Sequence, residues 1–580
     1  MPSGFRLVDT SLNSIVERAG QVDYVALTYC WSDGTGKTPH PSLQLKLHNV
    51  NQLSQENGLD VSKLPPVLAD AIQMCRDFGK RYLWIDQLCI IQDDPASKFS
   101  QIAAMDRIYK MADFTIVALG SSPGLPGVSS RPRDTTLSAV HGLWDGGFRP
   151  GSFSEAYFPI ADWAIGRSRW NTRGWTFQER KLSRRLVLID RQHAYFSCFQ
   201  GSFWEHDLRA FNTRHDDLGR VPFGTLGSIH VTSESFSKYA RIAVEYSKRQ
   251  LSFRSDVLNA FTGVGTTLSS LYHTSLLYGL LERYLFQSLL WKPDDFTRSQ
   301  VRDDNLDIPS WSWAAWDGAV DYGFTDSLEF RKPEGSFGEY ATDSFKPWHG
   351  DEVGSLVTFF YSDHSRIVRR VNEGRWWFTG EEIDDDEFAE RLEEWRQWRA
   401  GETYDNHGLI ATDAWDRCCH SPVEALRHVE LDLEAHAKAA ATAGCLAFTT
   451  TCAHLTLRPT MHNHDLSSLA VYFDMYTTPS DNTPAVFVGQ TMLMQRNWAQ
   501  RTFDLGRSYC VIVLAAGEAS KASERSHAWE KLASGPNLRI GLYVMITEQT
   551  DGVMYRLAIG VADVLAWNAA NPTWQSVVLA

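Results

Sequence analysis

The first part of the chain alternates between apolar runs that suit buried strands and amphipathic segments that suit helices. Residues 24–31 (YVALTYCW) form a β-branched and aromatic run, which is typical of a buried strand. Between 64 and 78, an early proline, apolar residues at helical spacing and the following Gly79 predict an amphipathic helix. The run 82–91 is almost continuously apolar apart from one Asp-Gln pair, as expected of a central parallel strand.

The alternation continues to about residue 198. Residues 97–112 carry apolar positions at helical spacing, and 113–120 (DFTIVALG) reads as a third strand. Further along, 175–182 is predicted to be helical, while 185–190 and 193–198 are predicted to be strands. Strands that alternate with helices predict an α/β fold of the doubly wound kind, built on a parallel sheet.

The pattern changes after this α/β part. A mainly helical extension ends in the tryptophan-rich segment PSWSWAAWDG, a charged and irregular stretch follows, and the last part alternates apolar and polar residues as antiparallel strands do. We therefore divide the chain as follows: N-terminal leader, 1–21; α/β domain, 22–205; helical Trp-rich extension, 206–335; charged insertion or linker, 336–440; and C-terminal β-rich domain, 441–580.

Composition and charge narrow the classes of function. The chain has 580 residues, of which 43% are hydrophobic and 22% charged, so a folded multidomain protein is expected. Its formal net charge of −14 gives no basic surplus to neutralise phosphates, so no nucleic-acid partner is expected. Nine cysteines scattered over the chain favour reduced, buried thiols over a disulfide scaffold. With neither a secretory signal nor a long apolar run, the sequence predicts a cytoplasmic protein without a membrane span.

Four sequence blocks carry a family resemblance. YVALTYCW, LPPVLADAIQMCRDFGKRYLWIDQLCIIQDD, MDRIYKMADFTIVA and RGWTFQERKLSRRLVLID occur in this order. In order and spacing they resemble the fungal heterokaryon incompatibility (HET) domain, which is distantly similar to TIR domains, and they cover residues 22–205. One departure is Ser32, which stands where the family pattern has a glycine.

The resemblance implies both a fold and a function. It predicts a TIR-like or flavodoxin-like parallel sheet in the HET core. It also implies a role in self/non-self recognition and innate immunity that ends in programmed cell death. Self-association through the HET core and a separate incompatibility partner protein would be the expected partners.

A first group of candidate residues should lie where the parallel strands end. In open parallel sheets, ligands bind beyond the carboxyl ends of the strands, and this is where Tyr29, Trp31, Asp86 and the loop 91–94 are expected. A carboxylate in an apolar strand must be hydrogen-bonded or functional. Asp86 is therefore a candidate ligand-binding residue, and the alternative is that it caps a loop or pairs with an arginine in the core.

A second group comprises Arg173, Trp175 and Glu179. TIR enzymes that cleave NAD carry a catalytic glutamate in a Trp-x-x-x-Glu arrangement, and Trp175 and Glu179 match that spacing. The carboxylate would stabilise an oxocarbenium-like transition state while an aromatic face stacks on the nicotinamide, with NAD as substrate and no cofactor. The alternative is structural, with Trp175 in the core and Glu179 paired with Arg173 or Arg180.

Four short segments are weaker candidates for a functional site. Gly34–Thr38 ends like a phosphate-binding loop but lacks the correctly placed first glycine, and Gly120–Gly124 matches a hydrolase elbow without the following helix. The clusters Cys418–His420 and His462–Asp465 lack the usual ligand spacing, so no metal is predicted.

Two other functions remain open at this point. The HET core could be a non-enzymatic signalling scaffold that self-associates. Alternatively, the protein could be a tailoring enzyme of a secondary-metabolite pathway, in which the tryptophans of 309–316 line a pocket for an apolar substrate.

Overall fold

In the computed structural model, the chain forms two compact units. Unit 1 comprises residues 1–233 and 249–271, and unit 2 comprises 234–248 and 272–580. The structure describes residues 1–31, 43–120, 124–126, 128, 165–166, 168–190, 194–198, 201–204, 207–211, 236–293, 301–302, 306–322, 353–355, 357, 359–362, 368–371, 375–376, 382–383, 444–460, 470–478, 484–491, 494–495, 499–500, 502–519 and 539–580.

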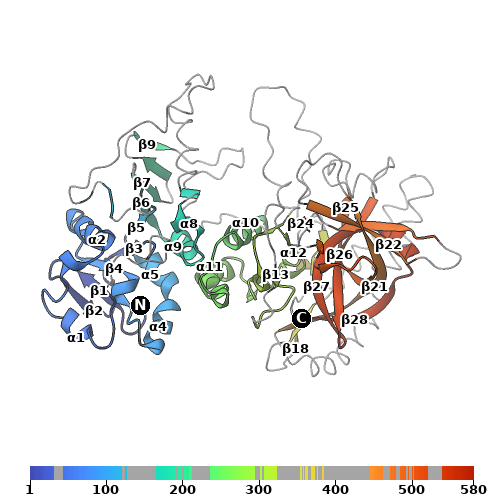
Figure 1. Ribbon diagram of the computed structural model, residues 1–580, viewed down its shortest axis with the longest axis horizontal. Helices are drawn as coiled ribbons and strands as arrows, with labels where there is room; N and C mark the ends of the chain where they lie inside the picture. Colours follow the sequence, from blue (N-terminus) through green and yellow to red (C-terminus); the bar gives the residue numbers. More distant parts are fainter. Residues whose placement is uncertain are drawn as a thin grey trace, which may run out of the picture. The chain divides into compact units, whose positions relative to one another are not determined.

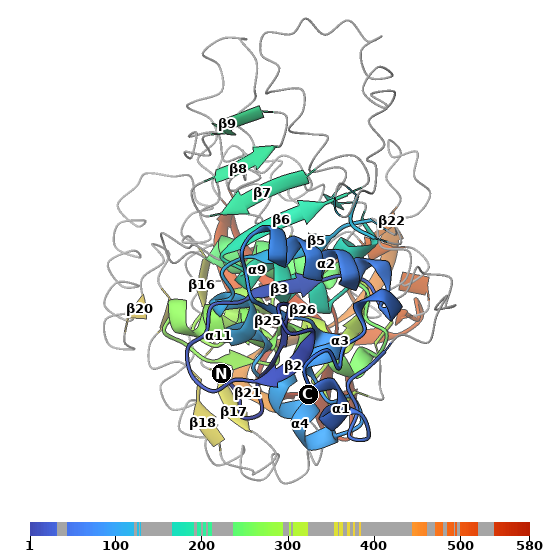
Figure 2. The same ribbon diagram turned by 90° about the vertical axis from the view of Figure 1, so that its left-hand side faces the viewer.

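Unit 1 is built on one mixed sheet with a parallel centre (Figure 1). The strand order is β2-β1-β4-β3-β5-β6-β7-β8-β9, in which β4, β3, β5 and β6 run parallel. The bounds are β1 Arg6–Asp9, β2 Ser14–Glu17, β3 Val25–Thr28, β4 Tyr82–Trp84, β5 Thr115–Ala118, β6 Arg185–Ile189, β7 Ala194–Cys198, β8 Gly201–Trp204 and β9 Asp207–Phe211. Figure 2 shows β6 to β9 as successive neighbours. The predicted parallel sheet of the N-terminal part is confirmed.

The helices of unit 1 follow local sequence rules. In the predicted first helix, Pro66 occupies the first turn, the buried face includes Leu68, Ile72 and Cys75, and Gly79 ends the helix with φ +65°. The bounds are α1 Val50–Leu53, η1 Val61–Lys63, α2 Pro66–Asp77, α3 Asp86–Cys89, α4 Pro95–Ile102, α5 Met105–Met111, α8 Arg169–Thr172, α9 Trp175–Leu182, η3 Arg254–Asp256, η4 Asn259–Phe261 and α11 Thr262–Leu271.

Two predicted elements of unit 1 were wrong in extent. The strand predicted over 82–91 ends at Trp84, and Asp86 begins the short helix α3, where its carboxylate accepts the N–H of Gln87 (2.7 Å). A continuous apolar run does not distinguish a buried strand from a buried helical turn. The single helix predicted over 97–112 is two helices, α4 and α5, because the helical conformation is interrupted at Ala103 and Ala104.

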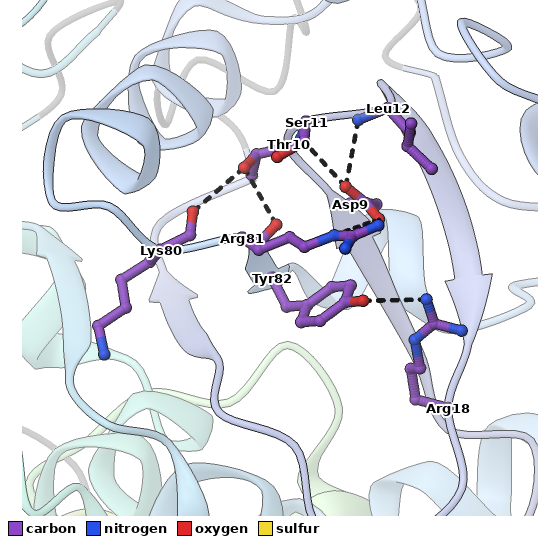
Figure 3. Close-up of polar contacts among 8 residues, drawn as sticks. All are labelled: Asp9, Thr10, Ser11, Leu12, Arg18, Lys80, Arg81 and Tyr82. Atoms are coloured by element: carbon purple, nitrogen blue, oxygen red, sulfur yellow. Dashed lines mark hydrogen bonds and ion pairs between the residues drawn. The ribbon is translucent and has the colours of Figure 1, made fainter.

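The β1–β2 hairpin, which lies in the segment predicted as a leader, is fixed to β4 by polar contacts (Figure 3). One oxygen of the buried Asp9 carboxylate accepts the N–H groups of Ser11 and Leu12, and the other forms an ion pair with Arg81 at 2.9 Å. The Arg18 guanidinium donates to the Tyr82 hydroxyl at 2.9 Å. The hairpin therefore extends the central sheet by two antiparallel strands.

Unit 2 is dominated by an antiparallel sheet, as the sequence predicts for the C-terminal part. Among the described residues this sheet has eleven strands: nine lie on its main path, three of them from 353–370, and β24 and β28 pair off that path. β19 and β20 form a separate two-stranded sheet. The bounds are β16 Val353–Ser355, β17 Phe360–Ser362, β18 Val368–Arg370, β19 Arg375–Trp376, β20 Glu382–Ile383, β21 Cys445–Thr460, β22 Ala470–Thr477, β23 Phe487–Thr491, β24 Met494–Gln495, β25 Ser508–Ala519, β26 Arg539–Thr550, β27 Val553–Asp563, α19 Val564–Ala569 and β28 Thr573–Leu579.

The extension predicted to be mainly helical is mixed. Besides β9, η3, η4 and α11 of unit 1, the described part contains helices interleaved with two-residue strands. A turn at Tyr278 (φ +47°) and Gly279 (φ +89°) reverses the chain between the first two of these strands. The bounds are α10 Phe236–Ser247, β10 Leu276–Leu277, β11 Leu280–Leu281, α12 Leu285–Ser288, β12 Lys292–Pro293, β13 Val301–Arg302, η5 Trp313–Ala315, β14 Trp316–Asp317 and β15 Val320–Asp321.

The tryptophans of this extension form a packed aromatic core in unit 2. Trp311, Trp313 and Trp316 are each at most 5% exposed, and edge-on ring contacts join Trp316 to Trp291 (5.9 Å) and Trp311 to Tyr278 (5.6 Å). Such contacts are the ordinary packing of large aromatic side chains. They favour a filled core over a pocket lined by these tryptophans.

Some sequence predictions fall outside the described residues. These are Gly34–Thr38, Cys418–His420, His462–Asp465, Ser32 and the centre of Gly120–Gly124. Within the described residues, none of the helices is both long enough and apolar enough to cross a membrane.

Candidate functional site

The site lies where the parallel strands of unit 1 end. Thr28 is the last residue of β3 and Tyr29 follows it, while Asp86 begins α3 two positions after the end of β4. Helix α9 contributes Glu179, whose carboxylate accepts a hydrogen bond from the Thr28 hydroxyl. Three elements far apart in the sequence thus bring polar groups together at one edge of the sheet.

Glu179 is held by a directed chain of hydrogen bonds. The indole N–H of Trp170, on α8, donates to the Thr28 hydroxyl oxygen at 2.6 Å. Because an indole nitrogen can only donate, the Thr28 oxygen accepts this bond and its own hydrogen is free for Glu179. The Tyr109 hydroxyl, on α5, is a second hydrogen-bond partner of the carboxylate. These contacts fix the orientation of Glu179 within the fold.

The Glu179 carboxyl group has a pKa close to neutral pH. It is 8% exposed, and burial raises its pKa to about 7. The hydrogen bond from Thr28 and the positive charge of Arg173 lower this pKa, whereas the nearby charge of Asp86 raises it. A carboxyl group with a pKa near 7 can exchange protons, or present a reactive carboxylate, at neutral pH.

Asp86 is half-buried and has two hydrogen-bond partners. The indole N–H of Trp31 donates to its Oδ2 at 2.7 Å, and the backbone N–H of Gln87 donates to its Oδ1 at the same distance. Burial raises the pKa of Asp86 to about 6, against the opposing effect of these hydrogen bonds. Trp31 itself is 36% exposed, so its ring forms the solvent side of this pair.

Tyr29 points toward α3. Its hydroxyl donates to the side-chain oxygen of Gln87 at 2.7 Å, and the Gln87 amide donates in turn to the carbonyl of Leu43 at 2.7 Å. Burial raises the pKa of the Tyr29 phenol well above its usual value, so the group stays neutral. Tyr29 is therefore a fixed, uncharged neighbour of both carboxyl groups.

Arg173 supplies the positive charge of the site. Its Nη1 donates to the carbonyl of Tyr29 at 3.1 Å, and its charge lowers the pKa of both Glu179 and Asp86. The backbone around it is fixed by two bonds to Gln250, one from the N–H of Gly174 (2.7 Å) and one to the carbonyl of Thr172 (2.6 Å).

A side chain at Gly174 would break this arrangement. Its β-carbon would lie 2.3 Å from Cδ2 of Leu251, which is closer than two such atoms can approach. Glycine is therefore required for steric reasons between Arg173 and Trp175. It lets the chain pass close to residues 250–251, and this close approach keeps Arg173 beside β3.

Trp175 has a different partner from the other candidates. Its indole N–H donates to Asp256 at 3.3 Å, and the ring is half-buried. The structure thus gathers Tyr29, Asp86, Arg173 and Glu179 and adds Trp31 through Asp86. Trp175 shares helix α9 with Glu179, and its role in binding stays a prediction.

Sequence reasoning missed four residues of this site: Thr28, Gln87, Tyr109 and Trp170. Gln87 carried a signal, because it is a second polar residue in an apolar run. The others gave none, since Thr28 contacts Trp170 and Glu179 across 142 and 151 positions of sequence. Among the described residues, no group of three or more His, Cys, Asp or Glu side chains could hold a metal ion.

Fold and site together define a mixed α/β domain with two carboxyl groups and an arginine at the carboxyl edge of its parallel strands. Residues 24–179 match the model of the family Heterokaryon incompatibility protein (HET), so this segment is a HET domain, as the sequence predicts. The match includes every residue of the site from Thr28 to Glu179.

A curated protein is similar to part of this chain. Heterokaryon incompatibility protein 6, OR allele, from Neurospora crassa is 32% identical over 103 residues, which are 17% of this chain and 14% of that protein. The likeness therefore spans far less than two thirds of the relative. No solved structure matches the chain.

Proposed function

We propose that this protein acts in heterokaryon incompatibility, and that its HET domain triggers cell death by cleaving NAD. The HET match and the incompatibility relative support the first part. The second part rests on one observation: a buried glutamate with a pKa of about 7, placed beside Arg173 and Asp86 at the carboxyl edge of parallel strands.

The order of the parallel strands supports a TIR-like core. Numbered by their place along the chain, β3, β4, β5 and β6 lie in the order 2-1-3-4 across the sheet. The flavodoxin-like order begins in the same way, and its ligand site lies at the ends of strands 1 and 3. In this chain those strands are β3, which ends at Thr28, and β5.

The proposed reaction breaks the bond between nicotinamide and ribose and adds water to the ribose. Ionised Glu179 would accept hydrogen bonds from ribose hydroxyls and stabilise the positive charge that develops at the anomeric carbon. Neutral nicotinamide would leave, and an indole face such as that of Trp31 or Trp175 would stack on its ring before cleavage. Arg173 would bind a phosphate of the same substrate.

A variant of Glu179 tests this proposal. Purified protein with all 580 residues, at high concentration, should release nicotinamide from NAD, and Glu179→Gln should lower the rate by at least about 100-fold. Glu282→Gln, which changes a buried glutamate of unit 2, is the matched control and should retain the rate. Unchanged release by Glu179→Gln would remove Glu179 from the mechanism.

A non-enzymatic scaffold is the second candidate. It is favoured because the polar groups of the site already have hydrogen-bond partners within the protein. Glu179 accepts a hydrogen bond from Thr28, Asp86 accepts one from Trp31, and Arg173 donates one to a backbone carbonyl. A scaffold should self-associate and kill cells equally well with Glu179→Gln. Loss of viability on expression in a filamentous fungus, compared for the two forms, separates the two functions.

A further inference from the structure

Two cysteines of unit 2 face each other across neighbouring strands. Cys452 lies on β21 and Cys510 on β25, and their sulfur atoms are 3.0 Å apart although the residues are 58 positions apart in sequence. Both side chains are buried, at 2% and 6% exposure. The sulfur atoms are about 1 Å farther apart than in a disulfide bond, so little movement would join them.

The strand register explains this proximity. β21 and β25 are antiparallel, with Cys452 opposite Ile512 and His454 opposite Cys510. Because side chains alternate between faces, all four project from the same face, and the two cysteines are diagonal neighbours. Cys452 is also the residue at which the pairing of β21 with β28 ends and its pairing with β25 begins.

Solvent reaches close to the pair. His454, directly opposite Cys510, is exposed, and so is the turn 504–508 that leads into β25. Cys510 is the third residue of that strand, so opening of two residues at the strand's start uncovers its sulfur. A small oxidant such as a peroxide could enter by this route, whereas a bulky disulfide reagent would be hindered.

The two thiols differ in acidity. Either S–H can donate to the other sulfur, and the arrangement in which Cys452 donates lowers the pKa of the Cys510 thiol and raises that of Cys452. The thiolate is the reactive form of cysteine, so Cys510 is the sulfur that reacts first.

We propose that Cys452 and Cys510 are a redox pair that closes to a disulfide when the protein meets a peroxide. The Cys510 thiolate attacks one peroxide oxygen and breaks the O–O bond, which gives a sulfenic acid and, after protonation, one water. The Cys452 thiol then attacks the Cys510 sulfur and displaces a second water. Two thiols are oxidised by two electrons, and the peroxide is reduced.

The disulfide would fasten β21 to β25 and close a long loop of chain. Closing a long loop restricts the unfolded chain, so the oxidised form should unfold at a higher temperature than the reduced form. The other described cysteines are free thiols, as the sequence predicts for the whole chain.

Peptide mapping of the full chain tests the proposal without any variant. Arg458 is followed by Pro459, so trypsin should leave residues 439–496 as one peptide and 508–521 as another. After mild treatment with hydrogen peroxide, quenching and alkylation, a linked peptide of these two segments should form and should disappear on reduction.

Cysteine variants show which two residues form the disulfide. Cys452→Ser and Cys510→Ser should each abolish the linked peptide, whereas Cys445→Ser, in the same tryptic peptide as Cys452, should retain it. The rise in unfolding temperature on oxidation should be lost in the first two and kept in the third. Alkylation of both cysteines after peroxide treatment, or their oxidation to sulfinic acid without a link, would overturn the proposal.

Discussion

Each unit of the molecule buries an ionisable side chain, and the two side chains differ in their partners and in their pKa values. In unit 2, Arg556 of β27 is 1% exposed, donates to the carbonyls of Leu289 and Trp291, and lies 3.7 Å from the centre of the Trp291 ring. Burial lowers its pKa to about 9, so it still carries its charge at neutral pH.

Glu179 of unit 1 is less fully compensated. It accepts hydrogen bonds from hydroxyl groups, but burial and the like charge of Asp86 raise its pKa, which lies at about 7. Burial alone therefore does not mark a reactive group. A buried charge with saturated partners is structural, whereas one balanced near its pKa is available for chemistry.

The largest effect is expected at Arg556. Arg556→Met leaves two buried carbonyls without their donor, which should lower the free energy of unfolding of unit 2 by about 3 kcal/mol. Arg507→Met is the control: it removes an exposed ion pair with Glu548 and should cost less than about 1 kcal/mol. Denaturant unfolding followed by tryptophan fluorescence measures both. Equal, small effects would show that Arg556 is not a structural charge.

Unlike Arg556, which stays charged at neutral pH, Glu179 should make the stability of the fold depend on pH. Its pKa rises from 4.5 in the unfolded chain to about 7 in the fold, so its stabilising contribution is complete below pH 4.5 and is lost as the pH rises through 7. The loss amounts to about 3 kcal/mol. Asp86 titrates in the same direction, from 3.8 to about 6.

Glu179→Gln removes this titration. Its stability relative to the wild type should therefore increase between pH 5 and pH 8, as measured by denaturant midpoints across that range. A constant difference between the two proteins would mean that the pKa of Glu179 is not raised by the fold.

Packing against the helix that carries Glu179 should have a smaller effect. A β-carbon at Gly263 of α11 would lie 2.7 Å from the Gln178 side-chain oxygen and 2.8 Å from Cβ of Asp106. Gly263→Ala should therefore lower stability by about 1–3 kcal/mol and displace α9. Gly166→Ala, where nothing lies within 4 Å, is the control and should be nearly neutral. Thermal unfolding of both variants decides whether this contact is tight.

The smallest effect concerns the pKa of Glu179 itself. Thr28→Val removes the hydroxyl that lowers this pKa, so the pKa should rise by up to about one unit. The midpoint of the pH dependence of nicotinamide release would move upward accordingly. Thr28→Ser keeps a hydroxyl at the same place and should restore the original midpoint; failure to do so would contradict the role assigned to that hydrogen bond.

Sequence patterns predicted the elements of unit 1 better than its site. Helix α9 was predicted with its observed bounds, because apolar spacing is a local signal. The helical turn that begins at Asp86 was not, because the apolar run around it suits a strand equally well. The sheet also gained β1 and β2, whose attachment depends on Asp9 meeting Arg81 from 72 positions away.

The same limit applies to the candidate residues. Asp86 and Glu179 were recognisable from the sequence as unusual carboxyl groups in family motifs. Their environment was not, because Thr28, Trp170 and Tyr109 are brought to Glu179 only by the folding of β3, α8 and α5 around α9. The pKa of Glu179, and with it the chemistry proposed here, depends on that tertiary arrangement.

NAD cleavage by Glu179 is tested most directly by the rate of nicotinamide release from NAD measured from pH 5 to pH 9. If the ionised carboxylate of Glu179 does the chemistry, the rate should rise with pH, with a midpoint near 7, and Glu179→Gln should remove the rising limb together with the activity. Absence of release by folded, associated wild-type protein, or a pH profile that Glu179→Gln leaves unchanged, would contradict cleavage of NAD by this carboxylate.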